Sequence, residues 1–228
     1  MSVIVALISN RDGVVASDGR LFGSALLDNG RVTQPASIAS DEFDKTFSLD
    51  RGKLIGAFSG LMRFSGKTIS EHVSEVAVPL LCRPVDLQAL TKEIEKEIKQ
   101  RLAHIDDQEV IFPCRKLDML LVAGMNLSRS EMRIVSIRFC PKDNVMTSET
   151  DTIAADRANR YYVRGEDHAA AAAGRLLADN HAPNRDAAFL KKLATQAVQS
   201  GIRAAGTHPH GSDPACGGKI FVKGTLYK

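Results

Sequence analysis

Short apolar runs separated by turn residues fill the first sixty positions of the chain. Their β-branched residues favour strands, and four strands are expected, at 3–8, 13–18, 45–49 and 53–60. Asp-Gly and Asp-Arg-Gly sequences join the members of each pair, which predicts two hairpins. The intervening residues 19–40 have a mixed composition and are expected to form a long loop with at most a short strand.

Helical spacing of apolar residues begins after position 60. The first helix is expected from Leu61 to Leu81, and the second follows Pro84 with Asp86 as its N-cap. Two more helices are expected near the C-terminus, at 168–179 and 186–205. The remaining apolar runs predict strands at 117–123, 132–139, 145–154 and 219–226.

The order of these elements excludes strict alternation of strand and helix. Strands come in runs and helices come in two pairs, so a Rossmann fold or a TIM barrel is not expected. Two mainly antiparallel sheets, each with a helical pair on its outer face, would bury every apolar stripe. We therefore expect an α+β fold, a four-layer αββα sandwich formed by one domain over residues 1–228.

Composition removes several classes of function. The 228 residues carry a net charge of only +3, with 30 basic and 27 acidic side chains interleaved and no Trp, so no nucleic-acid partner is expected. There is no run of 18 apolar residues and no export signal. The widely spaced Cys82, Cys114, Cys140 and Cys216 are then expected to be reduced thiols of a cytoplasmic protein.

The residue after the initiator Met is a candidate nucleophile. Removal of Met1, which is usual before a small residue, would leave Ser2 with a hydroxyl and a free α-amine on one residue. Such a residue can act as nucleophile and base together. The simpler interpretation of the same stretch is a buried first strand with an incidental Ser.

Four further sequence features favour Ser2 as a nucleophile over an incidental Ser. An acid, Asp18, ends the second strand, and Lys45-Thr-Phe opens the third. A Gly60-Leu pair ends the fourth strand, and Asp213-Pro-Ala-Cys216-Gly-Gly lies before the last one. In this order, behind a nucleophile at position 2, they resemble the proteasome β-subunit family of N-terminal nucleophile hydrolases. The start of the chain is most similar to the bacterial HslV, Anbu and betaproteobacterial proteasome homologue branches.

The resemblance implies an Ntn-hydrolase fold and a role for each matched residue. Ser2 would attack a peptide carbonyl, its own amine would accept the proton, and Gly60 N–H would stabilise the oxyanion. Supporting residues would orient these groups: Asp18, Lys45, Asp213 and Cys216. An apolar first pocket would be lined by Leu21, Phe58 and Met62. No cofactor or metal is implied.

The resemblance also implies partners. The chain would form a homo-oligomeric ring, in stacked heptamers, that encloses its active sites and degrades peptides or unfolded proteins. An AAA+ ATPase unfoldase would be the expected partner, and no membrane is involved.

Three departures from the family pattern leave other functions open. Ser replaces the usual Thr, 26 residues separate Asp18 from Lys45, and Val163-Arg164-Gly165 stands where the family has Gly-Ser-Gly. A structural or cargo-handling ring with little or no peptidase activity is therefore an alternative. A small-molecule amidase of the same fold class is a further alternative, although the lengths and order of the elements fit the proteasome branch better.

Some of the single features also have simpler interpretations. Asp18 and Lys45 could form an ordinary ion pair, and Lys53 competes with Lys45, although its place beside a turn glycine favours a solvated charge. His208, His210, Asp213 and Cys216 could bind zinc, but their spacing is not a recognised finger.

Overall fold

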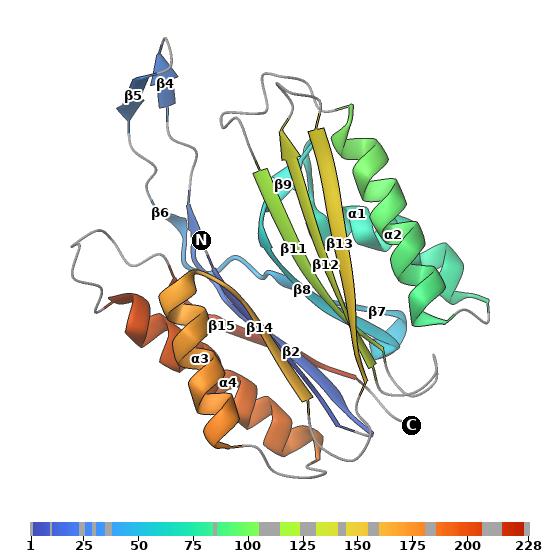
Figure 1. Ribbon diagram of the computed structural model, residues 1–228, viewed down its shortest axis with the longest axis vertical. Coiled ribbons are helices and arrows are strands. Elements are labelled where there is room, and N and C mark those ends of the chain that lie inside the picture. Colours follow the sequence, from blue (N-terminus) through green and yellow to red (C-terminus); the bar gives the residue numbers. More distant parts are fainter. Residues whose placement is uncertain are drawn as a thin grey trace.

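Two antiparallel sheets lie face to face at the centre of the molecule, and helices cover the outer face of each (Figure 1). The computed structural model describes residues 2–9, 11–22, 26–28, 31–34, 38–83, 86–104, 115–123, 131–140, 145–154, 160–180, 186–206 and 216–225. The fold is of the mixed α+β type that the element order predicts. No described helix combines the length and apolar character needed to cross a membrane.

The first sheet contains the N-terminal hairpin and has the strand order β14-β1-β2-β15. Its strands are β1 (Val3–Ile8), β2 (Gly13–Asp18), β14 (Arg160–Gly165) and β15 (Ile220–Gly224). Every neighbouring pair is antiparallel. The central strands β1 and β2 are completely buried because both of their faces are covered.

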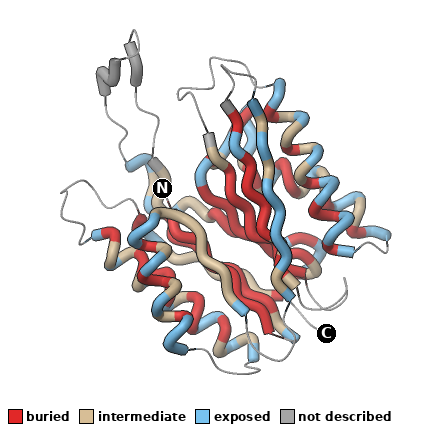
Figure 2. Tube along the Cα trace, in the orientation of Figure 1, coloured by how far each residue is buried: buried red, intermediate tan, exposed pale blue. Residues whose placement is uncertain are grey.

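The second sheet has the order β13-β12-β11-β8-β7 and is also antiparallel. Its strands are β7 (Thr46–Leu49), β8 (Leu54–Gly60), β11 (Arg115–Ala123), β12 (Glu131–Cys140) and β13 (Val145–Ala154). A short 3-10 turn, η1 (Asp50–Gly52), joins β7 to β8 as the hairpin prediction requires. The edge strand β13 is largely exposed, in contrast to the buried centre of the sheet (Figure 2).

Three apolar layers hold these elements together. Helices α1 (Ile69–Leu81) and α2 (Leu87–Leu102) pack on the outer face of the second sheet. Helices α3 (Asp167–Asp179) and α4 (Ala187–Gly206) pack on the outer face of the first sheet. A third layer, which includes Ile4, Ala6, Ala57 and Leu120, fills the space between the sheets. The four layers of the predicted sandwich are therefore present.

The start of α1 differs from the prediction. A small hairpin of β9 (Arg63–Phe64) and β10 (Lys67–Thr68) occupies the region that was expected to be helical. The helix begins only at Ile69, where Thr68 and Glu71 form a capping box that satisfies free backbone N–H groups. The predicted cap of α2 is correct, because Asp86 accepts a hydrogen bond from Ala89 N–H at 2.7 Å.

Two further strand regions were not predicted. The stretch 160–165 is β14, the neighbour of β1, whereas the apolar pattern predicts no strand there. The expected loop at 19–40 contains two small antiparallel pairs. These are β3 (Leu21–Phe22) with β6 (Ile38–Ser40), and β4 (Leu26–Asp28) with β5 (Arg31–Gln34).

Candidate active site

The Asp18 carboxylate is the centre of a buried polar cluster at the end of β2. Its Oδ1 accepts hydrogen bonds from the backbone N–H of Val3 at 2.9 Å and from Lys45 Nζ at 3.0 Å. Its Oδ2 accepts from the N–H groups of Gly217 at 3.1 Å and Arg20 at 3.3 Å. The fold therefore brings three distant segments onto one carboxylate, and the structure completely buries that carboxylate.

The Lys45 ammonium is held entirely inside the protein. Lys45 lies directly before β7, and its backbone O accepts from Phe58 N–H at 3.0 Å. The side chains of both Lys45 and Asp18 have no exposed area, so this is not a solvated ion pair. Burial lowers the pKa of Lys45 more than the neighbouring Asp18 raises it. By contrast, Lys53 is 41 % exposed and pairs with Asp50 at the turn, as its simpler interpretation predicts.

Ser2 lies next to this ion pair at the start of β1. It is 1 % exposed, and its Oγ is buried without a hydrogen-bond partner. The N–H of the following residue, Val3, donates to the same carboxylate oxygen as Lys45. Ser2 and the Lys45 ammonium are therefore linked through one shared acceptor.

A glycine on β14 fixes the backbone of Ser2. Gly165 has φ +140, and a Cβ at this position would lie 1.8 Å from Ser2 O. The next residue, Glu166, donates its N–H to Ser2 O at 2.9 Å and caps α3 with its side chain. The junction of β14 and α3 thus clamps the N-terminal segment from the side opposite Asp18.

Cys216 is part of the same cluster but is not a reactive thiol. It is completely buried against β1, β2 and the helices α3 and α4. Burial, and secondarily the Asp18 charge, raises its pKa to about 12. The adjacent Gly217 contacts the Arg20 guanidinium so closely that a Cβ would lie 2.6 Å from it. We call Ser2, Asp18, Lys45 and Cys216 the Ser2 cluster.

Gly60 ends β8 two residues after Phe58, which is hydrogen-bonded to Lys45. It has φ +88, and a Cβ would lie 2.0 Å from Lys116 O, so only glycine fits. Gly60 is exposed, unlike the rest of β8. It therefore lies at the exposed end of β8, two residues beyond the hydrogen bond between Phe58 N–H and Lys45 O.

The residues expected to line an apolar pocket lie in different environments. Phe58 is completely buried in the layer under α1 and α2, and its ring packs edge-on against Phe43. Met62 packs on the same layer, and Leu21 is half-buried on β3. Strand alternation turns Phe58 to the helical side and turns its neighbour Ser59 to the space between the sheets, so the assignment of Phe58 to a substrate pocket stays a prediction.

Asp213 and the two histidines of the proposed zinc site, His208 and His210, lie outside the described residues. Within the described ranges, no three His, Cys, Asp or Glu side chains are grouped to hold a metal ion.

Each sheet carries a row of polar side chains that points into the space between the sheets. The sequence did not reveal this arrangement. On the first sheet, Arg164 and Ser17 flank Ile4 in register. On the second, Ser59, Asp118 and Ser136 are neighbours in register. Ile4 belongs to the layer between the sheets, so these side chains point into it. The tyrosines and valine of 160–165 favour a strand and were the available signal.

The two sheets are closest at the other end of this space. There a Cβ on Gly13 would lie 2.3 Å from Val122 Cγ1. The ribbons diverge toward the end at which the N-terminus lies (Figure 1). The polar rows are therefore at the wider end, on the side of the Ser2 cluster.

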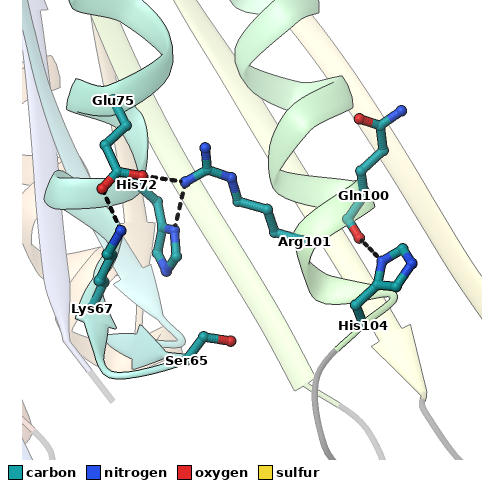
Figure 3. Close-up of a pocket in the computed structure, with 7 residues that line it drawn as sticks. All are labelled: Ser65, Lys67, His72, Glu75, Gln100, Arg101 and His104. Atoms are coloured by element: carbon teal, nitrogen blue, oxygen red, sulfur yellow. Dashed lines mark hydrogen bonds and ion pairs between the residues drawn. The ribbon is translucent and has the colours of Figure 1, made fainter.

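A separate open pocket of about 510 Å³ lies on the outer helical layer (Figure 3). Seven residues from α1, α2 and the β9–β10 hairpin line it: Ser65, Lys67, His72, Glu75, Gln100, Arg101 and His104. We call it the outer pocket. It contains no residue of the Ser2 cluster.

The charged groups of the outer pocket are paired with one another. Glu75 accepts from Lys67 at 2.5 Å and from Arg101 at 2.7 Å, and these bonds lower its pKa to about 2. His72 stacks on Phe64 and contacts Phe64 O through Nε2 and Arg101 through Nδ1. Because Arg101 only donates, His72 carries its proton on Nε2. Burial lowers the pKa of His72.

Comparison of the sequence with protein-family models and with curated proteins finds no match. The functional interpretation of the Ser2 cluster therefore depends on its chemistry.

Proposed function

We propose that the chain is an N-terminal nucleophile hydrolase of the proteasome β type, which cleaves peptide bonds with Ser2 after removal of Met1. The observation that carries the proposal is the shared acceptor: Lys45 Nζ and Val3 N–H both donate to Asp18 Oδ1. This places a buried ammonium beside the residue whose hydroxyl is buried and unpaired.

The chemistry follows from a free α-amine on Ser2. The amine has an ordinary pKa of about 7.7–8.0, so part of it is neutral near pH 7. The adjacent Lys45 charge disfavours the protonated amine and lowers that pKa further. The neutral amine takes the proton of Ser2 Oγ, directly or through water, as the oxygen attacks the substrate carbonyl.

The remaining residues position these groups. Asp18 holds Lys45 and the Ser2–Val3 peptide with one oxygen and the Gly217 loop with the other. Gly60 N–H is the proposed oxyanion donor, and removal of one such donor typically costs ~10²–10³ in kcat. The intermediate then collapses: the C–N bond of the substrate breaks, and the protonated Ser2 amine gives its proton to the leaving amine. Water hydrolyses the acylated Ser2, which releases the carboxylic acid and restores the hydroxyl.

The proposal extends to assembly and location. We propose a homo-oligomeric ring in the cytoplasm, with an ATP-driven unfoldase as partner and unfolded protein as substrate. A ring with no peptidase activity is the contrary outcome, and it requires that Ser2 be dispensable.

Hydrolysis of casein and of fluorogenic peptides by wild type and Ser2→Ala tests the proposal. Ser74→Ala, a change on helix α1 outside the Ser2 cluster, is the matched control. Loss of a nucleophile costs several orders of magnitude, so we expect Ser2→Ala to lower the rate at least ~10³-fold. Equal rates for wild type and Ser2→Ala would refute the peptidase and support the inactive ring.

A second candidate is a small-molecule amidase that uses the same nucleophile. The burial of Ser2, which is only 1 % exposed, favours a substrate smaller than an extended peptide. Ser2-dependent cleavage of short acyl amides without cleavage of casein would distinguish the amidase from the peptidase.

A further inference from the structure

Buried side-chain atoms that lack a hydrogen-bond partner lie mainly on one face of the first sheet. In the described part of the chain, only four buried side-chain N or O atoms lack a hydrogen-bond partner: Ser2 Oγ, Ser17 Oγ, Arg133 Nε and Arg164 Nε. Arg164, Ile4 and Ser17 are neighbours in register, and Ile4 points into the space between the sheets. Strand alternation places Ser2 on the same face as Ile4. Three of the four atoms therefore share this face.

Arg164 is within reach of the Ser2 hydroxyl. Ser2 O is bonded to Glu166 N–H, so Ser2 and Arg164 are diagonal neighbours on adjacent strands. Such neighbours are about 7–8 Å apart, a distance that a long side chain spans. The group that Arg164 binds would lie beside the atom that Ser2 attacks.

The charge of Arg164 has no counter-ion among the described residues. Its guanidinium lies 5.2 Å from the centre of the Tyr162 ring and forms no ion pair. An Arg side chain is always protonated, and its fork of donors matches the two oxygens of a carboxylate. Arg164 is half-buried, and its buried Nε has no partner within the protein, so its guanidinium is available to a carboxylate that enters from outside.

The opposite wall does not supply that carboxylate. Asp118 is already bonded to Ser136 Oγ at 2.6 Å and paired with Lys116 at 2.9 Å. Glu149 and Asp151 lie on the exposed edge strand β13. These three acids face Tyr162 across the space but form no contact with Arg164.

We propose that Arg164 binds a carboxylate of the substrate next to the bond that Ser2 cleaves, so that the substrates are peptides or amides with an acidic group beside that bond. A carboxylate only accepts hydrogen bonds, and the unpaired groups on this face, one guanidinium and two hydroxyls, can all donate. The inference rests on the proposed function for the identity of the cleaved bond, but the binding of the carboxylate does not depend on catalysis.

Matched peptides test the specificity. Four fluorogenic peptides carry Glu or Gln immediately before or after the cleaved bond. A charge-assisted hydrogen bond contributes about 1.5–3 kcal/mol, so we expect wild type to favour Glu over Gln in kcat/KM by at least ~10-fold at one position. In Arg164→Met the ratio should fall to about one. Arg164→Lys should retain part of the preference, and Arg175→Met on the exposed face of α3 should retain all of it.

Equal losses for the Glu and Gln peptides in Arg164→Met would overturn the inference, because they indicate an oxyanion or structural role. An unchanged Glu preference in that variant would also overturn it. If Arg164→Met does not fold, as judged by circular dichroism, Arg164→Gln replaces it with a neutral polar side chain of similar reach.

A binding measurement separates this inference from the proposed function. The four peptides are titrated into Ser2→Ala and into Ser2→Ala/Arg164→Met by fluorescence anisotropy. We expect Ser2→Ala to bind a Glu peptide at least ~10-fold more tightly than its Gln partner, with no preference in the double variant. If the Glu and Gln peptides bind Ser2→Ala equally, only water fills the site and the inference fails, whether or not Ser2 is catalytic. If Ser2→Ala still cleaves peptide, the proposed function fails and the binding ratio still decides the role of Arg164.

Discussion

The Ser2 cluster and the outer pocket arrange charge in opposite ways. In the outer pocket, Glu75 faces solvent and has two cationic partners, and His72 is saturated on both ring nitrogens. In the Ser2 cluster, the Asp18–Lys45 pair is completely buried, and beside it Ser2 Oγ and Arg164 Nε have no partner. The open outer pocket is thus at the place where the polar groups are already satisfied. In this protein, buried polar groups without hydrogen-bond partners indicate a reactive site better than the volume of a pocket does.

The largest expected effect is the cost of breaking the buried ion pair of the Ser2 cluster, compared with an exposed ion pair. Lys45→Met leaves Asp18 as a buried, uncompensated charge, so we expect a loss of about 3–5 kcal/mol in the free energy of unfolding. Lys53→Met removes an exposed turn charge and should cost less than about 1 kcal/mol. Urea unfolding of both variants measures the difference.

The double variant Asp18→Asn/Lys45→Met tests whether the loss of stability comes from the uncompensated Asp18 charge. Because it removes both charges, it should recover part of the stability that Lys45→Met loses. Equal stabilities of Lys45→Met and Lys53→Met would mean that the buried Asp18–Lys45 pair is no more important for the stability of the fold than an exposed ion pair.

Alanine substitutions at two glycines give the next largest expected effect on stability. Gly165→Ala places a methyl group against Ser2 O and forces alanine to φ +140, so we expect it to lose at least ~2 kcal/mol. Gly174 lies in helix α3, where an added methyl group would meet nothing within 4 Å, and Gly174→Ala should gain up to about 1 kcal/mol. Thermal unfolding compares the two. A Gly165→Ala protein as stable as wild type would contradict the clamp on the N-terminal segment.

The smallest expected effect is in the outer pocket and depends on pH. Bonds from Lys67 and Arg101 lower the pKa of Glu75 from 4.5 to about 2. The stabilisation is therefore present above pH 4.5 and is lost as the pH falls toward 2. Glu75→Gln should lower Tm by at most a few degrees at pH 6, because the groups are exposed, and by nothing near pH 2.

Hydrolysis at neutral pH should be unchanged by Glu75→Gln. If this variant removes Ser2-dependent hydrolysis while the fold is intact, the outer pocket takes part in the reaction and the contrast between the two regions fails.

Most of the fold could be predicted because apolar spacing reports which faces are buried. Residues 145–154 form a strand with the predicted bounds, and α2 begins at its predicted cap. Strand β14 was missed because it is a half-buried edge with an Arg at each end of its Tyr-Tyr-Val centre. The start of α1 was misplaced because the turn at Ser65 and Gly66 has positive φ, a tertiary preference that helical spacing does not report.

The site was predictable only in part. The meeting of Asp18 and Lys45 is a long-range contact that no local pattern encodes, and the ordered motifs alone suggested it. The two-residue period of β8 turns Phe58 toward the helices, an orientation that the order of the motifs does not report. Arg164 was regarded only as a replaced serine, because its orientation depends on the register of β14 with β1.

The most direct test of the central claim is the site of covalent labelling by a peptide epoxyketone or β-lactone. Intact-mass analysis of the purified protein first reports whether Met1 is absent, and fragmentation of the labelled chain then locates the adduct. We predict a chain that begins at Ser2 and carries one adduct on Ser2, with no adduct in Ser2→Ala. A chain without Met1 that takes up no label on Ser2 would contradict the account.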